Sequence, residues 1–424
     1  MARKMKDSGI EWIGEIPEGW EVHRIKNHFL IISGSGFKPE LQGQSTGDFP
    51  VCKASDISSS GHYLHTSANY ITTNFVKSQR FSIIPKGSIL FAKIGEAMRK
   101  NNRSLCLCDC CVDNNCQGLV PKKISSEFSY YLFTCIDMTW FDNAGTIPCI
   151  NNQKLYDCRF PFPSHDEQLL IANALNLQCT KINEILSHIR SSIEKYKKLK
   201  QAVITQAVTK GVRGEREMKD SGVEWIGEIP VDWTIQRFAR VAEVKSNLVS
   251  PDNYLEYPQI SPENIEKDSG KLLLPCKTVG EVGIISGNHL FHKGQILYSK
   301  IRPKLNKVCI APFDGLCSAD MYPIETNNDT RYIMYCILSD GFLQQVSMIT
   351  ENRVKMPKIN QTELSKLLLA MPNFLAEQKE IADYLDAKCA EIDKLIVKKE
   401  QLVKELESYK KSLIYEVVTG KKEV

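Results

Sequence analysis

The cysteine-rich stretch from Leu105 to Cys116 is the first place in this sequence where residue types and spacing suggest chemistry. It reads LCLCDCCVDNNC and contains Cys108 and Cys111 at the CxxC spacing found in zinc sites. A site with four cysteine ligands needs a second such pair, and the sequence has no other CxxC. Cys106, Cys108 and Cys110 also alternate as residues on one face of a strand do. The pattern favours buried free thiols, with a zinc site as the alternative.

Two clusters of basic residues follow two similar apolar runs, KGSILFAKI from Lys86 and KGQILYSKI from Lys293. Arg and Lys neutralise phosphates, and Arg or Asn can hydrogen-bond to base edges in the major groove. An ordinary solvated loop is the alternative, because most runs of charge are simply surface. Recurrence behind the same motif strengthens the hypothesis of DNA contact. The residues concerned are Lys93, Arg99, Lys100, Asn102 and Arg103 in the first cluster, and Lys300, Arg302, Lys304 and Lys307 in the second.

Two later polar loops are further candidates for DNA contact. They suit a contact surface because they combine amide, hydroxyl and basic side chains with glycine, although plain turns before a helix have the same composition. The candidates are Asn143, Thr146 and Asn151 in the first loop, and Asn352, Arg353 and Lys355 in the second.

Motifs for catalysis are missing. There is no GxxxxGK[ST] phosphate loop, and Gly34-Ser35-Gly36 is not followed by the third glycine of a dinucleotide fingerprint. The eight histidines show neither HxxxH nor HExxH spacing. Glu243-Val244-Lys245 has the residue types of a nuclease site, but no partnering carboxylate is evident. We therefore expect no catalytic residue, no metal site and no cofactor bound by this chain itself.

Composition sets the class of protein. A chain of 424 residues is long enough for two to four domains, and 42% apolar with 25% charged residues is ordinary for globular proteins. The net charge of +4 neither requires nor excludes a nucleic-acid partner. No apolar run is long enough for a membrane span or a signal peptide. Because 15 scattered cysteines suit a reducing compartment, we expect a cytoplasmic protein without membrane contact.

The sequence is duplicated. MKDSGIEWIGEIPEGW from Met5 and MKDSGVEWIGEIPVDW from Met218 are identical at 13 of 16 positions. A second match begins at Glu167-Gln168 and Glu377-Gln378, and the two KGxIL runs lie between these matches. Nearly constant offsets of 213, 210 and 207 residues mean that a whole half-chain was duplicated, with divergent middles. Two similar halves imply a pseudo-two-fold molecule.

Each half ends in a long helical pattern. Apolar residues recur at spacings of three and four, which is typical of a coiled-coil seam. Ser164 and Asn373 are suitable N-caps, and Gly211 and Gly420 are suitable ends. A helix from about Asp166 to Lys210 would be roughly 65 to 70 Å long, and chain order requires the two helices to run antiparallel. The predicted seams are Leu175, Cys179, Ile182, Leu186, Ile189, Ile193, Tyr196, Leu199 and Val203, and Leu385, Cys389, Ile392, Ile396, Leu402, Leu406, Tyr409, Leu413 and Val417.

This order of parts resembles the specificity (S) subunits of type I restriction-modification systems. The resemblance covers nearly the whole chain and is carried by the two leaders, the two KGxIL runs, Phe162-Pro163 and Met371-Pro372 ahead of the Glu-Gln pairs, and the paired helices. It implies an α+β fold with two mixed α/β target recognition domains at opposite ends of an antiparallel coiled coil. The predicted segments are leaders 1–20 and 214–233, recognition regions 1 (21–158) and 2 (234–370), and helices 159–213 and 371–424.

The resemblance also implies a function. Each recognition region would read one half of a split sequence in double-stranded DNA, while the helices set the gap and dock two methyltransferase (M) subunits, with restriction (R) subunits as further partners. S-adenosylmethionine, ATP and Mg²⁺ would then belong to the partners, so the chain itself would be no enzyme. The apolar leader residues Trp12, Ile13, Trp225 and Ile226 suit partner docking. The alternatives are a coiled-coil adaptor that binds only protein, and a zinc-containing nucleic-acid enzyme.

Overall fold

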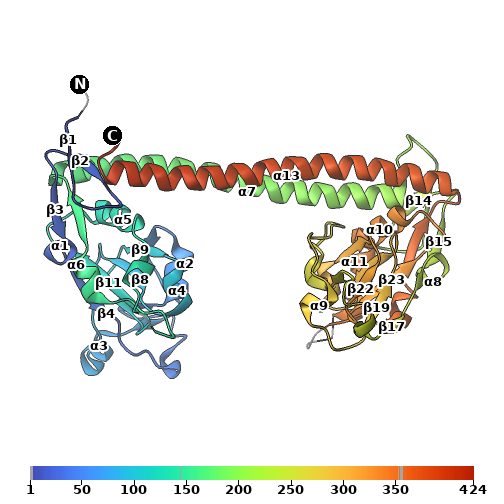
Figure 1. Ribbon diagram of the computed structural model, residues 1–424, viewed down its shortest axis with the longest axis horizontal. Helices are drawn as coiled ribbons and strands as arrows, with labels where there is room; N and C mark the ends of the chain where they lie inside the picture. Colours follow the sequence, from blue (N-terminus) through green and yellow to red (C-terminus); the bar gives the residue numbers. More distant parts are fainter. Residues whose placement is uncertain (1–2, 144, 352, 354–356) are drawn as a thin grey trace. The chain divides into compact units, whose positions relative to one another are not determined.

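Figure 1 shows the computed structural model of the chain, which describes residues 3–143, 145–351, 353 and 357–424. Contacts divide the chain into two units. Unit 1 comprises the chain up to His188 together with Leu402–Val424, and unit 2 comprises Ile189–Gln401. The two long helices, α7 (His165–Lys210) and α13 (Leu375–Val418), each contribute one part to each unit. Each unit therefore combines residues from both halves of the sequence.

The repeated leaders fold into the same antiparallel hairpin in both units. Lys6 faces Ile16 across the first hairpin, and Lys219 faces Ile229 across the second. Both isoleucines are buried, so identical sequence yields identical packing. The strands are β1 (Met5–Asp7) with β2 (Glu15–Pro17), and β13 (Met218–Asp220) with β14 (Glu228–Pro230).

Recognition region 1 is built on a five-stranded mixed sheet of order β4-β11-β8-β9-β6 and a three-stranded sheet of order β10-β5-β7. The KGxIL run forms β8, whose four residues Ile89–Ala92 are all buried. A further pair, β3 with β12, links the start and the end of the region. The strands are β3 (Glu21–Arg24), β4 (Phe29–Ser33), β5 (Phe49–Cys52), β6 (Tyr63–Leu64), β7 (Tyr70–Ile71), β8 (Ile89–Ala92), β9 (Arg103–Cys106), β10 (Cys111–Val112), β11 (Cys116–Pro121) and β12 (Arg159–Phe162). The helices are α1 (Ile25–His28), η1 (Pro39–Leu41), α2 (Ala54–Ser60), α3 (Thr73–Gln79), α4 (Gly95–Arg99), α5 (Ser126–Thr134), η2 (Met138–Phe141) and α6 (Asn152–Asp157).

Recognition region 2 repeats this plan with two four-stranded sheets, β16-β23-β20-β21 and β17-β19-β22-β18. The second KGxIL run forms β20, and β15 pairs with β24 as β3 pairs with β12. The strands are β15 (Thr234–Arg237), β16 (Glu243–Val244), β17 (Leu248–Val249), β18 (Gln259–Ile260), β19 (Asn288–Phe291), β20 (Ile296–Ser299), β21 (Val308–Ile310), β22 (Gly315–Cys317), β23 (Met321–Glu325) and β24 (Leu368–Met371). The helices are α8 (Phe238–Val241), η3 (Pro251–Asn253), η4 (Pro262–Asn264), α9 (Val279–Val282), η5 (Pro303–Leu305), α10 (Thr330–Leu338), α11 (Asp340–Thr350) and α12 (Gln361–Leu364). The predicted mixed and duplicated fold is confirmed.

The long helices begin and end nearly where the sequence predicts. The Ser164 hydroxyl accepts a hydrogen bond from the Glu167 N–H at the start of α7 (3.4 Å). Gly211 and Gly420 follow the helix ends with φ of +76° and +74°, a conformation that favours glycine. The predicted cap at Asn373 is wrong, because its amide donates to the Asp232 carbonyl and α13 starts only at Leu375.

The two helices pack in antiparallel fashion within each unit. In unit 1, Leu175 and Leu186 of α7 share a core with Leu413 and Val417 of α13. In unit 2, the later part of α7 shares a core with the earlier part of α13. The predicted seam is confirmed by burial at Leu175, Cys179, Ile182, Leu186, Ile189, Ile193, Leu385, Cys389, Ile392, Ile396, Leu413 and Val417.

Three predicted seam residues lie outside the seam. Leu199, Leu402 and Tyr409 are 49%, 43% and 52% exposed. The lysines beside two of them bond to the other helix instead. Buried Lys200 lies with Nζ 3.0 Å from Asp393 in unit 2, and at the surface of unit 1 Lys410 Nζ donates to Asn183 Oδ1 (2.8 Å). A buried polar position therefore interrupts the apolar seam in unit 2. Among the described residues, no helix is long and apolar enough to span a membrane.

The Glu-Gln pairs at the helix starts are structural joints. Gln168 accepts a hydrogen bond from the N–H of Ser125 before α5 and donates to the Pro163 carbonyl. Gln378 does the same with the N–H of Asp329 before α10 and the Pro372 carbonyl. One buried amide thus fastens a recognition region to its long helix in both units.

Candidate nucleic-acid interface

The first basic cluster lies between β8 and β9 and includes α4. Arg99 and Lys100 are exposed at the end of this short helix, and Arg99 Nη1 is 2.7 Å from the Glu96 carboxylate one turn earlier. The amide of Asn102 donates to Ser58 Oγ (2.9 Å) at the surface. Lys93 is half-buried at the end of β8. These side chains can reach a ligand from solvent, with Arg99 exchanging its internal ion pair for a phosphate or a base.

Arg103 is a correction to the predicted contact set. The side chain is buried, and its guanidinium donates to the Ile136 carbonyl and to Asn101 Oδ1. Burial lowers the pKa of Arg103 to about 10, so it is charged at neutral pH and held inside the fold. Its bonds stabilise the segment after α5, and its burial keeps the side chain away from solvent.

Two asparagines beside the basic clusters have the same structural role. Asn101 and Asn306 precede β9 and β21 with φ of +56° and +42°, in the left-handed region that asparagine tolerates. Asn101 Oδ1 accepts from the Met138 N–H (2.8 Å), and the Asn306 amide donates to the Leu338 carbonyl (3.3 Å). Sequence analysis missed this match, because the offset between the two halves changes to 205 residues at these turns.

The second basic cluster surrounds η5. Arg302 and Lys304 are exposed, with Arg302 in the left-handed region at φ +44°. Lys300 is half-buried over the Tyr322 ring, 5.2 Å from its centroid. Burial and, secondarily, the charge of Lys300 lower the pKa of His289. Lys307 donates to the Pro262 carbonyl (2.7 Å). Arg302 and Lys304 are therefore the members of the cluster most open to a ligand.

The structure joins the two predicted loops of unit 1 into one surface. The Gly95 N–H donates to the Pro148 carbonyl (2.8 Å), and the Ile150 N–H donates to the Lys93 carbonyl (2.9 Å). Asn143 and Thr146 are exposed on the second loop. The Asn151 side chain caps α6 and also donates to Asn143 Oδ1 (3.0 Å), which gives it a structural role as well.

Unit 2 repeats this joint. The Arg302 N–H donates to the Pro357 carbonyl (2.8 Å), and the Ile359 N–H donates to the Lys300 carbonyl (2.9 Å). Arg353 is bonded to both carboxylate oxygens of Glu363, which raises the pKa of the guanidinium. The predicted contacts Asn352 and Lys355 lie outside the described residues. In both units the two candidate loops form a single surface, called here the paired-loop surface: residues 93–102 with 143 and 145–151, and 300–304 with 353 and 357–358.

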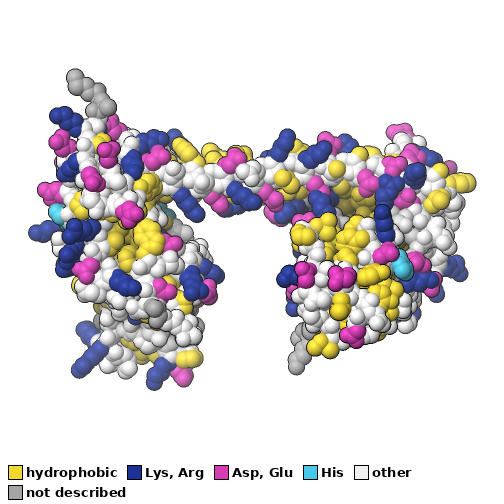
Figure 2. All heavy atoms as spheres, viewed as in Figure 1, with side chains coloured by type: hydrophobic (Ala, Val, Ile, Leu, Met, Phe, Trp, Pro, Cys, Tyr) yellow, Lys and Arg dark blue, Asp and Glu magenta, His cyan; other side chains and the backbone are white. Residues whose placement is uncertain are grey.

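Basic and acidic side chains are mixed over each unit. On the face shown in Figure 2, dark blue and magenta side chains alternate, and no large surface of one sign is present in that view. Attraction of phosphates would therefore depend on local clusters such as the paired-loop surfaces rather than on the field of a whole unit.

The leader residues predicted for partner docking contact their own unit. Ile13 is 1% exposed in the core of unit 1, so its assignment as a docking residue is corrected to a core residue. Trp12 is half-buried, with its ring centroid 5.3 Å from that of Trp140 and 5.5 Å from that of Phe160. In unit 2, the half-buried Trp225 and Ile226 pack beside α11 and the core. Docking by Trp12, Trp225 and Ile226 stays a prediction.

A matched set of tryptophan, arginine and glutamate joins each leader to its helix. Trp20 Nε1 donates to Glu167 Oε2 (3.1 Å), and Arg3 pairs with Glu167 (2.6 Å). In unit 2, Trp233 Nε1 donates to Glu377 Oε1 (3.2 Å), and Arg216 pairs with the same carboxylate (2.5 Å). The repeated Trp and Glu are visible in the sequence, but their contact across more than 140 residues is not.

The cysteines are free thiols, buried or partly buried. Burial is the main cause that raises the pKa of Cys111 to about 12, and that of Cys116 is raised as well, which keeps both thiols protonated. Among the described residues, no group of three His, Cys, Asp or Glu side chains is arranged to hold a metal ion. The buried-thiol interpretation fits the arrangement of this segment.

Two regions of similar fold, each with a paired-loop surface and each joined to the same pair of helices, define a two-site recognition protein. The family comparison makes the class specific. Residues 17–195 and 230–405 each match the model of the type I restriction modification DNA specificity domain, and the chain belongs to this family. Membership supports a role in DNA sequence recognition and places the chain among specificity subunits rather than catalytic ones.

Curated relatives agree with this assignment. The chain is 35% identical over 278 residues to the EcoDI specificity subunit of Escherichia coli, covering 62% of each chain. The alignment thus spans less than two thirds of that relative. The MjaIX specificity subunit of Methanocaldococcus jannaschii is 22% identical over 85% of this chain and 84% of that protein. A chain from a solved type I restriction-modification system aligns over 95% of this chain and 98% of its own length, with a TM-score of 0.67 and 14% identity, which shows likeness of fold.

Proposed function

We propose that this chain binds double-stranded DNA as the specificity subunit of a type I restriction-modification complex and reads a split target. Each recognition region contacts one half of the target through its paired-loop surface, and the two long helices set the gap between the halves. The observation that carries the proposal is the recurrence of the paired-loop surface, with the same two backbone hydrogen bonds, in two regions whose sequences have otherwise diverged.

Partner subunits supply the chemistry in this proposal. Two M subunits bind S-adenosylmethionine and methylate the target, and R subunits use ATP and Mg²⁺. Exposed apolar residues on the long helices offer M subunits a surface: Ile185 is 47% exposed on α7, and Leu395, 210 positions later, is 37% exposed on α13. Apolar side chains that a helix pair leaves in solvent are suited to a partner protein. The same exposure fits an adaptor that binds only protein, so DNA binding is what distinguishes the two functions.

The test removes charge from one paired-loop surface. Arg302→Ala and Lys304→Ala should weaken DNA binding by the complex with M. A phosphate contact predicts equal loss on all sequences and a salt slope shallower by about 0.9 per contact, whereas a base contact predicts a loss of ~1–3 kcal/mol at one base position. Binding is measured by fluorescence anisotropy at several salt concentrations.

Lys293→Ala is the matched control, because Lys293 is an exposed lysine just before β20, at the strand end opposite to Lys300. It should bind DNA as the unaltered chain does. Unchanged affinity and salt slope in both Arg302→Ala and Lys304→Ala would show that this surface does not contact DNA. A complex that contains M but shows no salt-dependent DNA binding at all would support the adaptor.

A further inference from the structure

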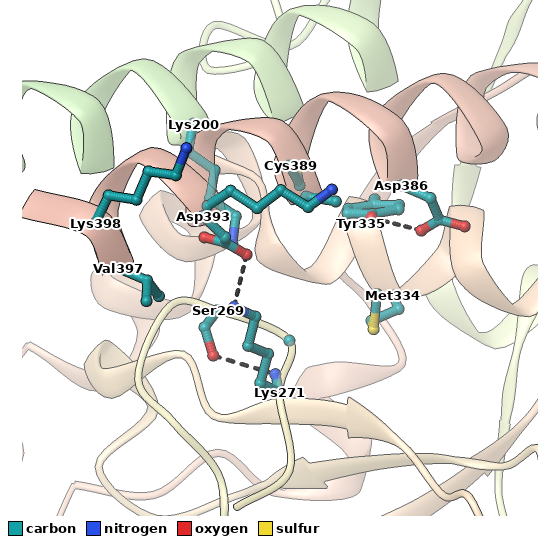
Figure 3. Close-up of a pocket in the computed structure, with 13 residues that line it drawn as sticks. Lys200, Ser269, Lys271, Met334, Tyr335, Asp386, Cys389, Asp393, Val397 and Lys398 are labelled. Atoms are coloured by element: carbon teal, nitrogen blue, oxygen red, sulfur yellow. Dashed lines mark hydrogen bonds and ion pairs between the residues drawn. The ribbon is translucent and has the colours of Figure 1, made fainter. Parts of the chain in front are cut away.

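Recognition region 2 extends a loop, residues 266–271, toward the long helices within unit 2. The loop is a tight turn, with Asp268 and Gly270 at φ of +54° and +75°. Ser269 closes it, since its hydroxyl donates to the Glu266 carbonyl (3.2 Å) and accepts from the Lys271 N–H (3.1 Å). Figure 3 shows the loop below α13, with a dashed line to Asp393. The turn thus presents Lys271 to the helix pair.

Asp393 of α13 is the point where three segments meet. Lys271 Nζ from the loop lies 2.7 Å from Asp393 Oδ2, and Lys200 Nζ from α7 lies 3.0 Å from both carboxylate oxygens. The side chains of Lys200 and Asp393 are 9% and 19% exposed, and that of Lys271 is 49% exposed. A single carboxylate therefore links both long helices to the recognition region.

Cavities lie on both sides of this link. One of about 650 Å³ is bounded by the loop, Met334, Tyr335 and Val397, and another of about 550 Å³ by the loop and residues 194–201 of α7. The Lys271–Asp393 ion pair attaches the loop to α13 beside these cavities. Several polar groups of the larger cavity bond to one another or to the fold, as Asp386 does to Arg331 and Tyr335, which suits a joint.

The internal repeat shows that this link is particular to unit 2. Position 183 corresponds to 393 and position 410 to 200, yet in unit 1 the pair is Asn183 with Lys410 (2.8 Å), an amide in place of a carboxylate. In recognition region 1, His62 follows Gly61 at the end of α2. Its ring pairs with Glu127 of α5 (3.2 Å), within recognition region 1 itself.

We propose that Asp393 is a positioning residue that holds recognition region 2 in a fixed orientation on the helix pair. Hydrogen bonds such as that from Tyr335 Oη to Asp386 (2.7 Å) attach α10 of the recognition region to α13. The Lys271–Asp393 ion pair is a second attachment to α13, and it opposes rotation of the region about the first. This inference rests on the proposed function, because the orientation of recognition region 2 affects DNA reading only if it helps to set the distance between the two half-sites.

The first measurement is hydrogen exchange of the full-length chain. Lys271→Met removes the link and leaves Lys200 paired with Asp393, so it separates the link from the stability of the helix pair. Amides of residues 262–275 should exchange roughly two- to fivefold faster, as expected when a part-buried ion pair no longer opposes local opening. Lys271→Arg should restore slow exchange. Asn183→Asp, at the matching position in unit 1, should leave residues 262–275 unchanged.

The second measurement is methylation, in the complex with M, of targets whose half-sites are one base pair closer or farther apart. Lys271→Met and Asp393→Asn should broaden the accepted spacing at least twofold relative to the best target, while the bases read in each half stay the same. Unchanged exchange in Lys271→Met would overturn the link. Faster exchange with unchanged spacing preference would overturn the positioning role. Failure of even the unaltered complex to methylate any target would instead reject the proposed function, and exchange would still decide whether the link exists.

Discussion

Arg99, at the end of α4, and Arg103, at the start of β9, lie four residues apart and have opposite surroundings. The Arg99 side chain is exposed and pairs with Glu96, whereas the Arg103 side chain is buried and bonds to a backbone carbonyl. Both are basic residues of the same cluster in the sequence, so composition alone assigns them the same role. The structure separates a side chain that can meet a ligand from one that holds the fold.

This contrast predicts different effects of substitution. Arg103→Ala should lower the free energy of unfolding by ~1–3 kcal/mol, because it leaves a cavity and an unpaired Ile136 carbonyl. Arg99→Ala should change it by less than about 0.5 kcal/mol, as is usual for an exposed pair one helical turn apart. Urea unfolding followed by tryptophan fluorescence measures both. Equal stability of the two variants would show that Arg103 has no structural role.

The joints between leaders and helices predict an asymmetry at the scale of elements. The Glu377 side chain is 2% exposed and pairs with Arg216, whereas the equivalent Glu167 is 26% exposed and pairs with Arg3. Removing one partner of a buried pair costs far more than removing one of an exposed pair. Glu377→Gln should therefore destabilise unit 2 by ~2–4 kcal/mol, and Glu167→Gln should destabilise unit 1 by less than about 1 kcal/mol.

Hydrogen exchange at the starts of α13 and α7 measures these two effects separately. The glutamine variants keep the size of the side chain and its ability to accept the tryptophan N–H, so the charge is the main change. A larger loss for Glu167→Gln than for Glu377→Gln would contradict the argument from burial.

Local signals explain which elements the sequence predicts. The start of α7 at His165, its end at Lys210 and most of its seam follow from a capping serine, a terminal glycine and apolar residues three or four apart. The seam fails at Leu199 and Tyr409, where the neighbouring lysine bonds to a polar residue on the other helix, a contact that one helix's spacing does not reveal.

The recognition regions depend on distant partners instead. The order β4-β11-β8-β9-β6 includes the parallel pair β6 and β9, whose members lie about forty residues apart and show no sequence signal for each other. The same limit applies to the candidate site. Its individual basic residues are visible in the sequence, but the hydrogen bonds that join residues near 94 to those near 149, and near 302 to those near 357, become visible only in the fold.

At the scale of the whole molecule, duplication has kept the joints and changed the surfaces. The Trp, Glu and Gln residues at each helix start make the same contacts in both units. The paired-loop surfaces have the same backbone hydrogen bonds but different side chains, with Arg99 and Lys100 in one and Arg302 and Lys304 in the other. A conserved frame with divergent surfaces is suited to reading two unequal half-sites.

Separate cores make the two recognition regions exchangeable. The main core of unit 1 and that of unit 2 share no residue. Replacing residues 21–158 with another recognition region of this family should therefore leave unit 2 intact, provided that the hydrogen bonds of Gln168 are kept. The exchange should change one half of the methylated sequence and leave the other half and the gap unaltered, because in the proposed function one region reads each half and the exchange leaves the helices untouched. Sequencing of methylated bases in cells that carry the hybrid with its M partner measures this directly. A simultaneous change in both halves would mean that the two regions do not read DNA independently. A changed gap with unchanged halves would mean that recognition region 1 helps to set the distance between the half-sites, so that the helices do not set it alone.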